Sequence, residues 1–180
     1  LAAHPSLVYF NGNNEVDVAW HNWGFQAQYN LQEKAQEEIE LAYQNLFQKT
    51  LPLYVNLFTE QSIPYVHTSP LSNWGNAEYF KHGTMHYWGV WHGKDPLTDF
   101  ATKIGRFNAE YGFQSFPEPS TINRFALTKD QNLHSSVMKT HQKSYVGNGM
   151  IEKHAKTYYG KAKDFETFIY YSQLTQRKAV

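Results

Sequence analysis

The sequence has 180 residues, with 16 lysines and arginines against 16 aspartates and glutamates, so its formal net charge at pH 7 is zero. A neutral chain is poorly suited to a phosphate backbone or an anionic membrane surface, so we expect no nucleic acid and no membrane as partner. No stretch reaches the roughly 18 apolar residues of a membrane-spanning helix. The absence of cysteine excludes disulfides and thiolate chemistry but leaves the cellular compartment open.

Taken in chain order, the first predicted element is a strand at residues 7–11, where the apolar run "LVYF" meets the turn-forming "NGNN". A helix is predicted over about residues 32–50, because apolar residues recur there at steps of four, three and four, the spacing of one helical face. A second strand is predicted within residues 62–70, a β-rich run fenced by prolines, and a loop over residues 71–76 follows it.

The second half of the chain predicts two further strands and then helices. Residues 85–93 are rich in aromatic and β-branched side chains and end at a glycine, and residues 104–117 form a similar run that ends at a proline. A helix is predicted to begin in residues 120–126, and helical patterns continue within residues 134–156 and from Asp164.

This order of strands and helices, with polar residues at the strand ends, predicts an α/β fold with parallel strand pairing. The sequence contains no internal repeat, no low-complexity tract and no clear linker, so we expect one domain or part of one. The first residue is Leu1 rather than methionine, and we expect the chain to be a mature product or a piece of a longer protein.

Aromatic residues are unusually frequent: 13 tyrosines, 12 phenylalanines and 5 tryptophans make up 17% of the chain. Several of them stand among glycine, asparagine and histidine, in segments whose composition is typical of loops. Aromatic rings that line a polar cleft suit ligands with flat C–H surfaces, and sugars are the leading example. Aromatic residues in loops also serve ordinary packing, so composition alone leaves both interpretations open.

Two glutamates share one setting: Glu15 and Glu110 each end a predicted strand, and each has an asparagine close by on its N-terminal side. The carboxyl ends of parallel strands meet at one face, where α/β barrels place their active sites. Two carboxylates there could divide the work of glycoside hydrolysis, one as general acid and the other as nucleophile. Either glutamate alone could equally cap a helix or meet a surface lysine, so the hypothesis depends on the pair.

Histidines offer a competing interpretation, a zinc hydrolase, because imidazole and carboxylate groups are common zinc ligands. The candidates are His67, His82, His86 and His92. No HExxH sequence is present, and strand alternation in residues 85–93 would place Trp88 and Val90 on the same side as His86 and His92. This mixture is more typical of a cleft wall than of a metal cage, so we expect no metal and no cofactor.

Four stretches, in this order, carry a resemblance to a known family. They are "HPSLVYFNGNNE" (4–15), "TSPLSNWG" (68–75), "HYWGVWHG" (86–93) and "RFNAEYGFQSFP" (106–117). Together they resemble the catalytic barrel of β-mannosidases in glycoside hydrolase family 2. The likeness covers nearly the whole chain, and the four stretches in order are far more specific than any one of them.

The resemblance implies a retaining glycosidase on a (β/α)8 TIM barrel, with the acid on the fourth strand and the nucleophile on the seventh. Glu15 matches the acid/base and Glu110 matches the nucleophile. Asn14 matches the asparagine that holds the 2-hydroxyl of the sugar. Trp23 and Trp74 match tryptophans that line the sugar pocket.

One position departs from the family's pattern. His92 stands where some relatives carry a tyrosine near the nucleophile, and we carry it over as a pocket residue. Either side chain can donate a hydrogen bond to a carboxylate. Histidine also titrates near neutrality, so this departure would show in the pH dependence of activity.

The resemblance implies that residues 1–180 are part of one catalytic barrel domain, about strands 4 to 7 with their helices, and that the flanking β-sandwich domains and the rest of the barrel are absent. An eight-stranded barrel needs about 250 residues, so we expect the remainder of its own polypeptide to be required and the isolated chain to be inactive. The implied substrates are β-mannoside oligosaccharides, cut to release terminal β-D-mannose. A bacterial source would favour a periplasmic or secreted setting.

Two alternatives stay open at this point. The same two-carboxylate chemistry serves β-galactosidases and β-glucuronidases of the family, which differ in how the pocket treats the hydroxyl groups of the sugar. The chain could also be a non-catalytic carbohydrate-binding piece. A retaining enzyme needs its two carboxyl groups about 5–5.5 Å apart, whereas a binding piece has no such requirement.

Overall fold

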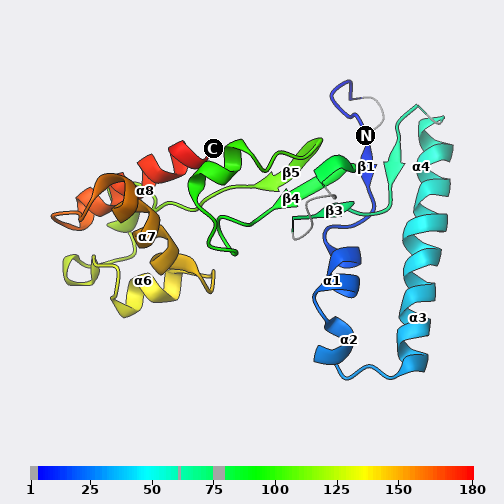
Figure 1. Ribbon diagram of the computed structural model, residues 1–180, viewed down its shortest axis with the longest axis horizontal. Coiled ribbons are helices and arrows are strands. Elements are labelled where there is room, and N and C mark those ends of the chain that lie inside the picture. Colours follow the sequence, from blue (N-terminus) through cyan, green and yellow to red (C-terminus); the bar gives the residue numbers. More distant parts are fainter. Residues whose placement is uncertain (1–3, 61, 75–79) are drawn as a thin grey trace. The chain divides into compact units, whose positions relative to one another are not determined.

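The structure is a computed structural model that describes residues 4–60, 62–74 and 80–180. Helices and short strands form two compact units (Figure 1). The first unit comprises Leu1–His86 and Gly105–Ala109, and the second comprises Tyr87–Ile104 and Glu110–Val180. Among the described residues, we find no helix with the length and apolar character that crossing a membrane requires.

The strands of the first unit are very short, and two pairs of them run parallel. β1 (Phe10–Asn11) pairs with β2 (Tyr65–Val66), and a single parallel bridge between Asn14 and Ser69 extends this pairing toward the following helix. A separate three-stranded sheet has the order β3 (Ser72–Asn73), β4 (Thr84–Tyr87) and β5 (Phe107–Tyr111). The β1–β2 pair confirms the predicted parallel pairing, and β3 and β4, a pair that was not predicted, also run parallel.

The predicted strand positions are correct but their lengths are wrong. Val8, expected inside a strand buried on both faces, is 67% exposed, and β1 begins only at Phe10. The predicted loop at residues 71–76 contains β3, which sequence analysis missed.

The strand expected over residues 85–93 ends at Tyr87, because the chain then folds back on itself. The backbone N–H of His92 donates to the carbonyl of Trp88 at 2.8 Å, and that of Asp95 donates to the carbonyl of Gly89 at 3.0 Å. The predicted alternation of His86, Trp88, Val90 and His92 on one strand face is therefore wrong beyond Tyr87.

Two short helices, α1 (Val16–Asn22) and α2 (Phe25–Gln28), follow β1 and lie alongside a long helix (Figure 1). That helix consists of α3 (Glu33–Tyr43), a π-helical segment η1 (Gln44–Thr50) and α4 (Leu51–Thr59). The prediction of a helix over residues 32–50 is confirmed, but the helix continues nine residues further.

The helix continues past Pro52, although proline has no backbone N–H to donate. In a π-helix each N–H bonds the carbonyl five residues back, so Pro52 would leave the carbonyl of Phe47 without its donor. The hydroxyl of Tyr65 donates to that carbonyl at 2.7 Å. A side chain from β2 thus replaces the missing hydrogen bond, and this long-range contact is invisible in the sequence.

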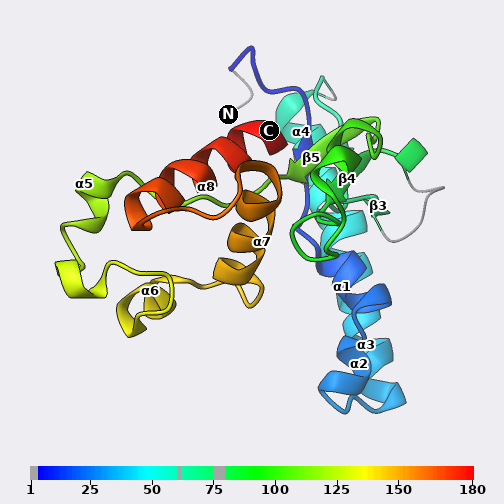
Figure 2. The ribbon, with the colours of Figure 1, turned by 60° about the vertical axis from the view of Figure 1, so that its left-hand side comes forward.

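The second unit is mainly helical, and the predicted helices there are confirmed with changed bounds. Its elements are η3 (Leu97–Ala101), α5 (Pro119–Ile122), η4 (Thr128–Asp130), α6 (Ser136–His141), α7 (Gly147–Tyr159) and α8 (Phe165–Ala179). α7 packs against α8 (Figure 2). The side chain of Asp164 caps α8 by accepting the backbone N–H of Thr167 at 2.8 Å. The fully buried Ile151 of α7 and Ser172 of α8 lie in the core of this unit.

Candidate active site

Glu15 lies between β1 and α1, at the N-cap position of α1. Its backbone is left-handed (φ 62°, ψ 5°), a conformation that residues other than glycine seldom adopt and that is enriched at functional sites. The turn is held by hydrogen bonds on both sides: the Glu15 N–H donates to the Ser69 carbonyl at 2.7 Å, and the Glu15 carbonyl accepts from Ala19 at 2.9 Å. The side chain is 24% exposed, so its carboxylate is held firmly and still reaches solvent.

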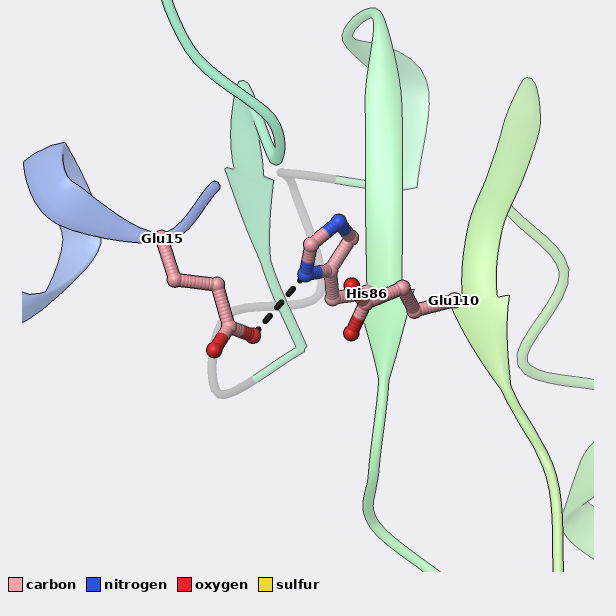
Figure 3. A group of neighbouring side chains, drawn as sticks. All are labelled: Glu15, His86 and Glu110. Atoms are coloured by element: carbon pink, nitrogen blue, oxygen red, sulfur yellow. Dashed lines mark hydrogen bonds and ion pairs between the residues drawn. The ribbon is translucent and has the colours of Figure 1, made fainter. Parts of the chain in front are cut away.

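Glu15 is hydrogen bonded to a buried histidine of β4 (Figure 3). Nδ1 of His86 lies 2.8 Å from Oε1 of Glu15, and the His86 side chain is only 2% exposed. Nε2 of the same ring lies 3.0 Å from Oγ of Ser69, which is also buried. Because an ionised carboxylate can only accept, Nδ1 carries the proton when Glu15 is charged, and Nε2 then accepts from the Ser69 hydroxyl.

Asn13 ties the Glu15 turn to the strand beside it. Its amide oxygen accepts the backbone N–H of Val16 at 3.1 Å and the hydroxyl of Thr68 at 2.9 Å. Its amide nitrogen donates to the His67 carbonyl at 2.8 Å and to the Tyr43 hydroxyl at 3.2 Å. Burial raises the pKa of Tyr43, so this phenol stays protonated at neutral pH. One side chain thereby links three segments around the turn: the start of α1, the end of α3 and residues 67–68.

Glu110 is the fourth residue of β5 (Figure 3). Its carboxylate accepts a hydrogen bond from a tryptophan side chain. The indole Nε1–H of Trp88, in the segment after β4, donates to Oε2 of Glu110 at 3.2 Å. The Glu110 side chain is half-buried. Both predicted acids are therefore half-buried carboxylates that accept a hydrogen bond from a ring N–H.

The remaining predicted residues lie close to one or other of these acids in the chain. Asn14 makes the parallel bridge to Ser69 and directly precedes Glu15. Trp23 closes the end of α1 and is 49% exposed. Trp74 is half-buried in the turn after β3. His92 packs its ring edge-on against Trp88, which brings it next to the Glu110 donor, and stacks on Tyr145 at 5.3 Å.

A largely apolar cavity of about 630 Å³ opens beside Glu15 within the first unit. It lies between the α1–α2 segment and α3, and Asn14 and Glu15 form part of its wall. The rest of the wall is mainly aromatic and aliphatic: Val16, Ala19, Trp20, Trp23, Phe25, Tyr29, Leu31, Ile39, Glu40 and Tyr43. Trp23 contributes one face of it, with Phe25 packed edge-on against its ring at 6.1 Å. Trp23 and Glu15 thus line the same cavity, and the role of Trp23 toward a sugar stays a prediction.

Sequence analysis does not predict the hydrogen bonds that connect His86, Ser69 and Trp88 to the two glutamates. His86 was considered only as a metal ligand or part of a cleft wall, and Ser69 was hidden in a Thr-Ser-Pro run. The available signal was a histidine in the middle of an apolar strand, since a buried imidazole requires partners for its two nitrogens. For Trp88 no signal existed, because its position depends on the turn that follows Tyr87.

Comparison of the sequence and the structure with known proteins finds relatives of one kind. No family model matches the chain. The whole chain aligns with proteins named β-mannosidase B, at 31% identity in Aspergillus terreus and 32% in Aspergillus niger, in each case over 22% of the relative. A crystal structure of a β-D-mannosidase from Dictyoglomus thermophilum matches 99% of this chain and 21% of its own, with 28% identity and a TM-score of 0.79.

The comparisons indicate a glycosidase-like α/β segment, and the relatives that match it are β-mannosidases. The fold is a mixed α/β fragment with short parallel strands, like the matching segment of a crystallised glycosidase. The chain is similar along its whole length to β-mannosidases, as the sequence resemblance indicated. It spans about a fifth of the length of the relatives it matches.

Proposed function

We propose that this chain is the part of a retaining β-mannosidase that carries both catalytic glutamates. The observation that carries the proposal is the setting of Glu15. A strained turn at the carboxyl end of a parallel strand pair presents a half-buried carboxylate, anchored by His86, beside an aromatic cavity. Strand ends of this kind are where α/β barrels place catalytic groups. The similarity to β-mannosidases along the whole chain supports the same interpretation.

In the proposed mechanism, Glu15 is the general acid and then the general base, and Glu110 is the nucleophile. Glu110 attacks the anomeric carbon while Glu15 gives its proton to the departing glycosidic oxygen, so the C–O bond to the leaving group breaks as the ester bond to Glu110 forms. Glu15 then takes a proton from water, which attacks the same carbon and releases Glu110. Two inversions give net retention, and the geometry requires the carboxyl groups about 5–5.5 Å apart.

Four further residues are proposed to hold the terminal mannose. Asn14 would bond the 2-hydroxyl, which is axial in mannose and so distinguishes it from glucose and galactose. Trp23 and Trp74 would pack against the C–H faces of the ring, and His92 would contribute to the pocket near the nucleophile. The half exposure of Trp23 at the cavity beside Glu15 supports its assignment.

The proposed architecture is a partial (β/α)8 barrel, in which β1, β2, β4 and β5 correspond to about barrel strands 4 to 7. Parallel pairing of β1 with β2 and the alternation of strands with helices support this assignment. The proposal treats residues 1–180 as part of one catalytic domain. It requires the remainder of the polypeptide, with its flanking β-sandwich domains, to complete the barrel, so the isolated 180-residue chain should not turn over an aryl β-mannoside.

Replacement of each glutamate in a polypeptide of the relatives' full length tests the roles. Glu110→Ala should abolish hydrolysis of 2,4-dinitrophenyl β-mannoside, and added azide should restore turnover and give the α-mannosyl azide. Glu15→Ala should instead give the β-mannosyl azide, because its nucleophile is intact. Glu37→Ala, at an exposed position of α3, is the control and should behave as wild type. Full activity of either catalytic variant would refute the assignment.

A substrate panel separates the proposed activity from that of sister enzymes. The names of the relatives favour mannosides over β-galactosides or β-glucuronides. Aryl glycosides that differ only in the sugar would show this preference as a ratio of kcat/KM values. A non-catalytic carbohydrate-binding piece would bind mannose and hydrolyse none of the panel.

A further inference from the structure

The buried pair of His86 and Ser69 has no role in the two-carboxylate mechanism, yet it contacts the proposed acid directly. Both side chains are almost fully buried in the first unit, His86 on β4 and Ser69 after β2. Burying an imidazole and a hydroxyl is costly unless both are hydrogen bonded. The imidazole lies between the two polar groups, with Nε2 facing Oγ of Ser69 and Nδ1 facing Oε1 of Glu15.

The contact with Glu15 sets the tautomer of His86 when Glu15 is ionised, because a charged carboxylate can only accept and Nδ1 must then carry the proton. Ser69 Oγ lies 3.3 Å from Thr84 Oγ1, and Thr84 Oγ1 in turn accepts the backbone N–H of Leu71 at 3.2 Å. The Ser69 hydroxyl therefore has two acceptors within reach, Thr84 Oγ1 and Nε2 of His86, and its single proton serves one of them at a time. When Ser69 donates to Nε2, the neutral ring carries its proton on Nδ1, which faces Oε1 of Glu15.

We propose that His86, oriented by Ser69, is a positioning residue that keeps Oε1 of Glu15 occupied and assigns proton transfer to Oε2. This inference rests on the proposed function. A carboxyl group can carry its proton on either oxygen, and only one of them can face the glycosidic oxygen. With Oε1 held by the Nδ1–H, Oε2 gives its proton to the leaving group as the glycosidic bond breaks. The same Oε2 takes a proton from water in the second step.

The turn fixes where the Glu15 side chain starts, but a glutamate side chain has three rotatable bonds before its carboxylate. The hydrogen bond with Nδ1 of His86 at 2.8 Å limits this freedom. A misplacement of about 1 Å at a catalytic group can cost about 100-fold in rate.

The test uses a polypeptide of the relatives' full length and two aryl β-mannosides, because poor leaving groups need the acid and good ones do not. In His86→Ala, kcat/KM for phenyl β-mannoside should fall by about 100-fold, and kcat/KM for the 2,4-dinitrophenyl glycoside should fall far less. His86→Asn keeps an N–H donor near the position of Nδ1 and should recover part of the loss. The split between the two substrates is the ratio of their fold losses in kcat/KM. Ser69→Ala removes the contact with Nε2 of the ring and should give a split smaller than that of His86→Ala.

Controls separate this inference from a structural effect and from the proposed function. His154→Ala removes another buried histidine, in the second unit, and should leave the ratio of the two kcat/KM values unchanged. Glu15→Ala should show the largest split. If Glu15→Ala shows none, the proposed function fails. If Glu15→Ala shows the split but His86→Ala lowers both rates equally or not at all, only the positioning role is overturned. Should His86→Ala fail to fold, the same comparison is made with His86→Asn and Ser69→Ala.

Discussion

The indole N–H of Trp88 donates a hydrogen bond to Oε2 of Glu110 at 3.2 Å. Trp88 follows β4 by one residue, and Glu110 lies within β5, so the bond joins a turn to a strand. A hydrogen bond to a charged acceptor is worth about 1.5–3 kcal/mol. It also limits the rotation of the carboxylate, which a nucleophile that attacks along one direction requires.

The first prediction concerns this bond. Trp88→Phe keeps an aromatic ring but removes the N–H, and we expect kcat/KM for aryl β-mannosides to fall by roughly 10-fold or more, the equivalent of one such bond. Trp91→Phe is the matched control, because the Trp91 indole donates to Ser144 Oγ at the same 3.2 Å. That variant should lose stability and keep its kcat/KM. Unchanged kinetics in Trp88→Phe would contradict the role of the bond.

A second prediction concerns Asn13, whose amide makes four hydrogen bonds around the Glu15 turn. Asn13→Ala removes the acceptor of the buried Thr68 hydroxyl and the donor to the His67 carbonyl, and a buried polar group left unsatisfied costs about 1–3 kcal/mol. We expect a lower Tm together with a loss of activity. Asn13→Asp keeps the accepting oxygen for Val16 and Thr68, so it should lose less stability. Equal melting temperatures for wild type and Asn13→Ala would show that the turn does not depend on Asn13.

A third prediction uses two glycines with opposite surroundings. A Cβ on Gly12 would lie 2.6 Å from the His67 backbone carbonyl and 2.1 Å from the Tyr65 hydroxyl, so Gly12→Ala would force β1 away from β2. A Cβ on Gly149, within α7, would meet nothing within 4 Å, and alanine there should stabilise the helix by about 0.5–1 kcal/mol. Thermal unfolding of the two variants should therefore shift in opposite directions. A Gly12→Ala protein as stable as wild type would show that the strands can separate at little cost.

Elements that depend on local signals could be predicted from the sequence, whereas those that depend on contacts between distant residues could not. The helix that includes α3 and the capped helix α8 were predictable, because periodicity and an N-cap aspartate are local signals. Strand ends were not predictable, because they depend on turns such as the one that brings the His92 N–H to the Trp88 carbonyl. The passage of the helix through Pro52 depended on Tyr65, which lies thirteen residues away.

For the candidate site the same distinction holds. Glu15, Asn14 and Trp23 could be named as candidates because they follow one another closely in a recognisable stretch, and they share the wall of one cavity, while their roles stay predictions. The partner of His86 could not be predicted, since its contact with Glu15 joins positions 71 residues apart. The separation of Glu15 from Glu110 stays a prediction of the proposed mechanism. Candidate acids can be named from a sequence, whereas the side chains that contact them require the fold.

The last prediction concerns pH and stability. Burial lowers the pKa of His154, which lies on α7 with its ring edge-on to Phe113 at 5.1 Å. The neighbouring Lys153 lowers it further. Nε2 of His154 has no hydrogen-bond partner among the residues that the structure describes. The folded chain therefore holds this imidazole neutral at a pH where the unfolded chain already binds a proton.

The direction of the effect follows from that difference in proton binding. The unfolded histidine titrates near pH 6.5, so the contribution of neutral His154 is fully present above that value. As the pH falls from about 6.5 toward the lower pKa of the folded state, the free energy of unfolding should decrease, by at most about 1.4 kcal/mol per pH unit for one proton. His154→Leu removes the titration and keeps an apolar side chain, so its unfolding free energy should depend less on pH between about 5 and 6.5. Chemical denaturation of both proteins across this range measures the two slopes. Above about pH 7.5 the difference between the two proteins should be constant, and parallel curves throughout the acidic range would show that His154 accepts its proton without cost in the folded state.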